Sequence, residues 1–112
     1  MHPEEAEQSE AFAVLSQAFS LDAPAARLPA SQRPSLEDVR HFLIERIGRL
    51  LSEQPALLMS LLYRIDVDEA DVRRTLAESP PSRLPADLAD LVIERQLAKV
   101  RMRHRYREGG TQ

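Results

Sequence analysis

Glutamate and histidine side chains recur every four residues in the segment 37–45, a spacing that could bring metal ligands together. On a helix, Glu37, His41 and Glu45 would share one face. Carboxylate and imidazole groups both bind transition metals. Dimetal sites in helical bundles, however, use a Glu three residues before a His on the inward face, whereas this trio would lie opposite the apolar side chains of its helix. The pattern therefore predicts an exposed polar face and no metal site.

No other segment carries the residues of a catalytic or cofactor site. Asp66 and Asp68 begin like a calcium loop, but Ala70 stands at its third ligand position and Asp71 at the position of its invariant glycine. The chain has no cysteine, three scattered histidines and three glycines, which provide neither a nucleophile triad nor a phosphate-binding loop. We expect a protein that is not an enzyme and that has no cofactor or metal.

The most specific local motif spans residues 61–76, with the sequence LLYRIDVDEADVRRTL. It resembles the helix, turn and recognition helix of bacterial helix-turn-helix regulators, which insert the second helix into the major groove of DNA. The resemblance implies that Arg73 and Arg74 contact DNA. The turn lacks the common glycine, however, and the carboxylates at the start of the second helix would face phosphates, which favour cations. A DNA-binding regulator is therefore the alternative function.

The two ends of the chain carry opposite charges. Residues 1–10 hold four glutamates and no lysine or arginine, while residues 95–107 hold six basic residues and no acid. The candidate contacts to RNA or to an acidic partner are Arg101, Arg103, Arg105 and Arg107. Cations near a helix C-terminus also complement the helix dipole and need no partner. Alternatively, the acidic start lies against the basic end, within the chain or across a dimer.

Proline and capping residues divide the chain into five predicted helices, with no strand pattern. The predicted helices begin at about residues 4, 35, 55, 68 and 85. Ser35 and Asp38 form a capping box, which marks the start of the second helix, and Asp68 caps the fourth. The prolines of residues 21–34 predict an extended, semi-stiff connector after the first helix.

Apolar side chains indicate which helices are buried. They surround most of the circumference of residues 55–65, which predicts a central helix there. The final helix, expected to end at about residue 106, carries two apolar stripes. One includes Leu84, Leu88, Leu91, Val92, Ala98 and Met102, and the other consists of Ile93, Leu97 and Val100. Either this helix is wrapped by others of the same chain, or the second stripe pairs with another chain.

The predicted fold is all-α, a small bundle of four core helices plus an N-terminal amphipathic helix on a proline-rich connector. We assign residues 1–20 to the helical arm, 21–34 to the Pro/Ala-rich connector, 35–107 to the bundle and 108–112 to a flexible tail. A tethered arm can pack on its own bundle, swap into a second copy, or bind a different protein. The candidate interface residues are Phe12, Leu15, Phe19, Ile93, Leu97 and Val100.

Composition limits the class of protein. The chain of 112 residues has room for one core, and its net charge of -3 neither favours nor excludes a nucleic-acid partner. The lack of cysteine suits a reducing cytoplasm, the first residues lack the order of a secretory signal, and no apolar run approaches the roughly 20 residues that span a bilayer. We expect a cytoplasmic, non-enzymatic interaction or scaffold protein that forms a homodimer and has no membrane partner.

Overall fold

The computed structural model describes residues 3–19 and 35–109 of the chain. Within these ranges the fold is all-α, as predicted, and contains no strand. The helices are α1 (Pro3–Phe19), α2 (Leu36–Glu53), α3 (Pro55–Arg64), α4 (Glu69–Glu78) and α5 (Leu84–Gly109). The predicted connector over 21–34 and the last three residues of the predicted tail lie outside the described residues.

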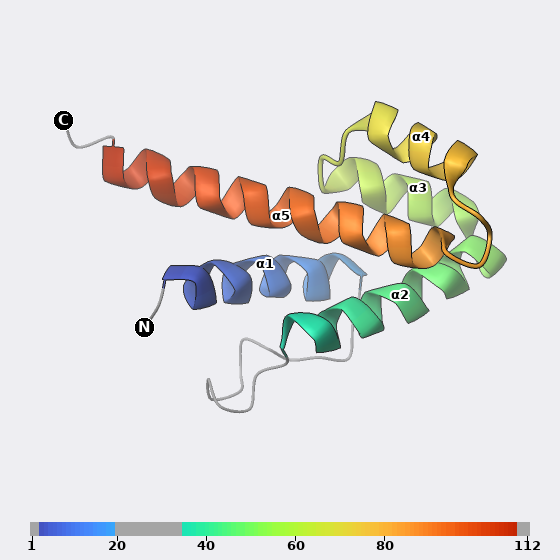
Figure 1. Cartoon of the computed structure of the whole chain (residues 1–112), viewed down its shortest axis with the longest axis horizontal. Coiled ribbons are helices and arrows are strands. Elements are labelled where there is room, and N and C mark those ends of the chain that lie inside the picture. The colour runs from blue at the N-terminus through green and yellow to red at the C-terminus, as the bar shows by residue number, and fades with distance from the viewer. Residues whose placement is uncertain (1–2, 20–34, 110–112) are drawn as a thin grey trace.

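The longest helix, α5, is the central element of the bundle. It contacts α1, α2 and α4, while α2 also contacts α3 and α1. Figure 1 shows α1 antiparallel to α5, beside its C-terminal part, with the other helices grouped around its N-terminal part. The helix continues through Gly109, beyond the predicted end at about residue 106, so the first two residues of the predicted flexible tail are helical.

The prediction that residues 55–65 form the central helix is wrong. Leu58, Leu61 and Leu62 of α3 are buried, but Leu57 on the same helix keeps 39% of its area exposed. A helix of 10 residues reaches only a small part of the core, whereas the 26 residues of α5 extend along the whole bundle. Apolar residues around a helix therefore did not identify the buried one, because length and position decide how many neighbours it can have.

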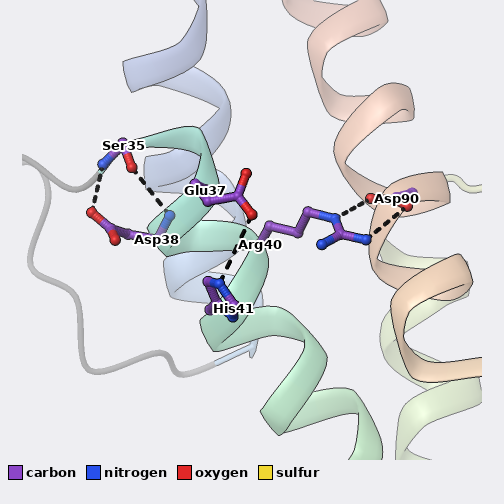
Figure 2. A network of polar contacts seen from close by, with 6 residues as sticks. All are labelled: Ser35, Glu37, Asp38, Arg40, His41 and Asp90. Atoms are coloured by element: carbon purple, nitrogen blue, oxygen red, sulfur yellow. Dashed lines mark hydrogen bonds and ion pairs between the residues drawn. The ribbon is translucent and has the colours of Figure 1, made fainter. Parts of the chain in front are cut away.

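The predicted helix starts are confirmed. The Asp38 backbone N–H donates to Ser35 Oγ at 3.2 Å, and the Ser35 N–H donates to Asp38 Oδ2 at 3.0 Å (Figure 2). At the start of α4, the Ala70 N–H donates to Asp68 Oδ1 at 2.8 Å. A side-chain cap of this kind stabilises a helix by about 1 kcal/mol. These local bonds fix where α2 and α4 begin, independently of the rest of the bundle.

The N-terminal helix shares the hydrophobic core with residues 35–109. Phe12, Leu15 and Phe19 are buried in one continuous cluster with side chains of α2, α3, α4 and α5. At the end of α1, Arg46 Nε donates to the Phe19 carbonyl oxygen at 3.1 Å, which ties this end to α2. Of the three arrangements left open for the N-terminal arm, the structure has the one in which the arm packs on its own bundle. Among the described residues, no helix is both long and apolar enough to cross a membrane.

Candidate docking surface on α5

The six candidate interface residues lie inside the chain. At most 9% of the area of any of them is exposed. The buried set comprises Phe12, Leu15 and Phe19 of α1 and Ile93, Leu97 and Val100 of α5. The sequence predicts that these residues contact a partner but does not identify it, and in the structure they pack in the chain's own core. The sequence left two explanations for the two apolar stripes of α5. The structure agrees with the first of them, in which other helices of the same chain pack around this helix.

The acidic start of the chain lies against the basic end, as one of the alternatives predicted. Arg101 Nε is 3.2 Å from Glu7 Oε2, an Arg103 nitrogen is 3.4 Å from Glu10 Oε1, and His104 Nε2 is 2.8 Å from Glu10 Oε2. Partly exposed pairs of this kind contribute about 0 to 1 kcal/mol each. Burial of a Phe or Leu side chain contributes about 1.5 to 3 kcal/mol. Apolar packing therefore provides most of the free energy that keeps α1 on the bundle, and the ion pairs add a preference for its present alignment along α5.

The two arginines suggested by the helix-turn-helix resemblance are exposed on α4, and each pairs with a carboxylate of its own helix. Arg73 binds Glu69 at 2.6 Å, and Arg74 binds Asp71. The hydrogen bond and the charge of Glu69 raise the pKa of Arg73 above its ordinary value. Since Glu69 and Asp71 lie beside these guanidinium groups on the same helix, a DNA phosphate drawn to either arginine would also meet a carboxylate that repels it.

The turn between α3 and α4 is fastened to α5 by three polar side chains. Gln96 Nε2 donates to the Ile65 carbonyl oxygen at 3.1 Å, and Arg95 Nε donates to the Asp66 carbonyl oxygen at 3.0 Å. Lys99 Nζ lies 3.2 Å from Asp66 Oδ2. Asp66 has a φ of 62°, the left-handed conformation that Gly, Asn and Asp tolerate best. Asp66 thus replaces the glycine common in such turns.

A groove of about 640 Å³ runs between α1 and the C-terminal part of α5. It is lined by Val14 of α1 and by Arg95, Gln96, Lys99, Met102, Arg103 and Tyr106 of α5. Met102 and Tyr106 keep 64% and 79% of their area exposed, more than the other large hydrophobic side chains of the described residues. The sequence placed Met102 on a buried stripe, and this was wrong. Met102 belongs to the C-terminal part of α5, and Figure 1 shows α1, but not α2, α3 or α4, beside that part of the helix.

A second pocket, of about 510 Å³, lies between α4 and α5 and is acidic. Three of the carboxylates that line it have other roles: Asp66 pairs with Lys99, Asp68 caps α4, and Asp71 pairs with Arg74. Among the described residues, no group of three or more His, Asp or Glu side chains is placed to hold a metal ion. The carboxylates of this pocket are best explained by the stability of the turn and of α4.

Glu37, His41 and Glu45, considered above for metal binding, are exposed on α2, and Figure 2 shows the first two of them. His41 Nε2 is 3.8 Å from Glu37 Oε1, and both side chains are exposed. Arg40, between them, reaches across to α5, where its Nε donates to Asp90 Oδ1 at 2.7 Å. The hydrogen bond and charge of Asp90 raise the pKa of Arg40. Arg40 therefore links α2 to α5.

Comparisons with protein-family models, with curated proteins and with solved structures found no match to this chain. A functional assignment thus depends on the surface of the molecule itself. On that surface, the groove between α1 and α5 combines exposed apolar side chains with a cationic rim, a combination that the acidic pocket and the α4 face lack.

Proposed function

We propose that this chain is a non-enzymatic interaction module that binds another protein through the groove between α1 and α5. The observation that carries the proposal is the exposure of Met102 and Tyr106, four residues apart on α5, in a groove that Val14 of α1 also lines. Methionine, tyrosine and arginine are enriched in the cores of protein interfaces, while lysine is more common at their rims. Burying two such side chains would give a partner an anchor for binding.

The rest of the described surface offers less to a partner protein. Other exposed hydrophobic side chains, such as Phe42 of α2 and Leu76 of α4, lie on other helices and do not line this groove. Exposed hydrophobic residues that stand alone are normal in monomeric proteins. The paired side chains over a groove are the exception, which is why we assign them the function.

The proposed partner is a different protein rather than a second copy of the chain. The homodimer expected from the sequence depended on residues that are buried within the chain, Leu97 and Val100 among them. DNA binding through α4 receives no support from its geometry, because Arg73 and Arg74 are paired with their own helix. We retain the cytoplasm as the proposed compartment, since the absence of cysteine suits reducing conditions.

The proposal can be tested by placing a photoactivatable benzoyl-phenylalanine at residue 106 and, as a control, at residue 63, in cells that express the chain. Tyr63 of α3 is also exposed, at 48%, but does not line the groove. We expect a protein that crosslinks from position 106 only. After purification, it should bind the unmodified chain and lose at least about tenfold in affinity with Met102→Glu, as for an interface anchor.

Two results would overturn the proposed function. One is crosslinking from position 106 that yields nucleic acid, or no product beyond that seen from position 63. The other is a captured protein that binds the Met102→Glu variant as tightly as the unmodified chain.

A further inference from the structure

We infer that the partner presents an acidic amphipathic helix to this groove, of the same kind as α1. The inference rests on the proposed function and adds to it the chemistry of the partner. It is drawn from the way in which α5 already binds one helix, and from the repetition of that chemistry on the adjacent face of α5.

The contact between α1 and α5 combines two kinds of interaction. The apolar side chains of α1, such as Phe12 and Leu15, are buried in the core. Nearer the start of α1, Glu7 pairs with Arg101 of α5, and Glu10 pairs with Arg103 and His104. A helix with acids in its first turns and apolar residues after them is therefore a ligand that α5 accepts.

The groove next to α1 offers the same two kinds of group, but in the reverse order along α5. Arg95, Lys99, Met102 and Tyr106 follow one another at intervals of four, three and four residues, so they form one line along α5. The line is about three turns long, roughly 16 Å. Its basic half would meet carboxylates, and its apolar half would meet aliphatic or aromatic side chains of a helix of similar length. A helix packed antiparallel to α5, as α1 is, would bring its acidic first turns to the apolar half of the line, at Met102 and Tyr106. The partner helix is therefore expected to run parallel to α5, which brings its acidic first turns to Arg95 and Lys99.

The cations on the rim can exchange their present partners. Lys99 pairs with Asp66, whose side chain is 69% exposed, and Arg103 pairs with Glu10, with half of the Arg103 side chain in contact with solvent. Pairs with this much exposure contribute little to stability. A carboxylate on an incoming helix can therefore replace either partner at small cost, while it gains the burial of Met102 and Tyr106.

A second copy of the chain does not satisfy this chemistry with its own α1. In the folded chain, the apolar side chains of that helix, such as Phe19, are already buried. As a free peptide, in contrast, the α1 sequence has both its apolar and its acidic residues available. The peptide of residues 3–19 is therefore a suitable probe for the groove of the intact protein.

The experiment measures fluorescence anisotropy of the labelled 3–19 peptide as the full chain is added. We expect saturable binding, weakened about tenfold or more by Met102→Glu and by Tyr106→Ala, and unchanged by the control Tyr63→Ala. A peptide in which Glu7 and Glu10 are replaced by lysine should bind at least several-fold more weakly, and added salt should reduce the difference between the two peptides. Circular dichroism would confirm that each protein variant keeps its helix content.

Three results would overturn the inference. The first is an absence of saturable binding. The second is binding that Met102→Glu and Tyr106→Ala leave unchanged, which would mean that the peptide exchanges with α1 instead of entering the groove. The third is equal binding of the acidic and lysine-substituted peptides. None of these results affects the proposed function, which fails only if no protein that depends on Met102 is captured from position 106.

Discussion

The side-chain amide of Gln96 donates a hydrogen bond to the carbonyl oxygen of Ile65, which lies 31 residues earlier in the chain. Only 2% of Gln96 is exposed, and among the described residues it is the one buried residue with a polar side chain. Its bond fixes the turn between α3 and α4 to α5. The position of α4 in the bundle thus depends on this buried amide, on the more exposed bonds of Arg95 and Lys99 to Asp66, and on apolar packing.

Replacing Gln96 by leucine should lower the free energy of unfolding by about 1 to 3 kcal/mol, because the Ile65 carbonyl loses its buried partner while the volume of the side chain is nearly kept. Urea unfolding followed by circular dichroism measures the change. Gln17→Leu on α1 is the matched control, since Gln17 is exposed. Equal stability of the two variants would contradict the role given to the buried amide.

The left-handed conformation of Asp66 leads to a second prediction. At a φ of 62°, a β-branched residue is strained, so Asp66→Val should destabilise the chain by about 1 to 2 kcal/mol. Asp66→Gly should have a much smaller effect, because glycine adopts this backbone conformation without strain, and the strain relieved offsets the loss of the exposed ion pair with Lys99. The measurement is thermal unfolding of both variants, and a glycine variant that is the less stable of the two would refute this account.

The packing of α1 on its own chain predicts how stability responds to protein concentration. Leu15 is fully buried, so Leu15→Ala should cost about 2 to 5 kcal/mol. The unfolding midpoints of both the unmodified chain and the variant should be independent of protein concentration, as for a monomer. A midpoint that rises over a hundredfold range of concentration would instead show that α1 packs on a second copy.

The link between Arg40 and Asp90 predicts a contribution that does not depend on pH in the neutral and mildly alkaline range. Asp90 raises the pKa of Arg40 in the folded chain, so the stabilisation is complete below the ordinary arginine pKa and is lost only as pH rises through the higher folded value. Arg40→Gln should therefore lower the urea midpoint by the same amount at about pH 7 and about pH 9. A difference that shrinks at the higher pH would contradict this.

Local features of the fold could be predicted from the sequence because their causes are local. Ser35 and Asp38 are three residues apart, and the geometry of a helix start suffices to bring them together. Phe42 of α2, 38% exposed, shows the same local origin, because it lies off the apolar stripe that includes Val39, Leu43 and Ile47. Periodicity within one helix is enough to determine which of its faces is apolar.

The groove could not be predicted because it depends on where helices end in space. Met102 shares a stripe with Leu88 and Val92, and nothing in the periodicity separates the two buried residues from the exposed one. The exposure of Met102 depends on which helices lie beside the C-terminal part of α5, where Figure 1 shows α1 but not α2 or α4. The three bonds from α5 to the turn at Asp66 were missed for a similar reason, since they join residues 29 to 33 positions apart.

The pairing of Glu7 with Arg101 joins positions 94 residues apart, which places α1 against a helix that is synthesised much later. A ribosome adding roughly 5 to 20 residues per second needs about 5 to 20 s to cover that distance. Throughout this interval, the apolar face of α1 lacks α5, the helix against which most of it packs, and the loop that must then close is long. Newly made chains thus pass through a period in which Phe12, Leu15 and Phe19 remain open to chaperones or to neighbouring nascent chains, until α5 is released.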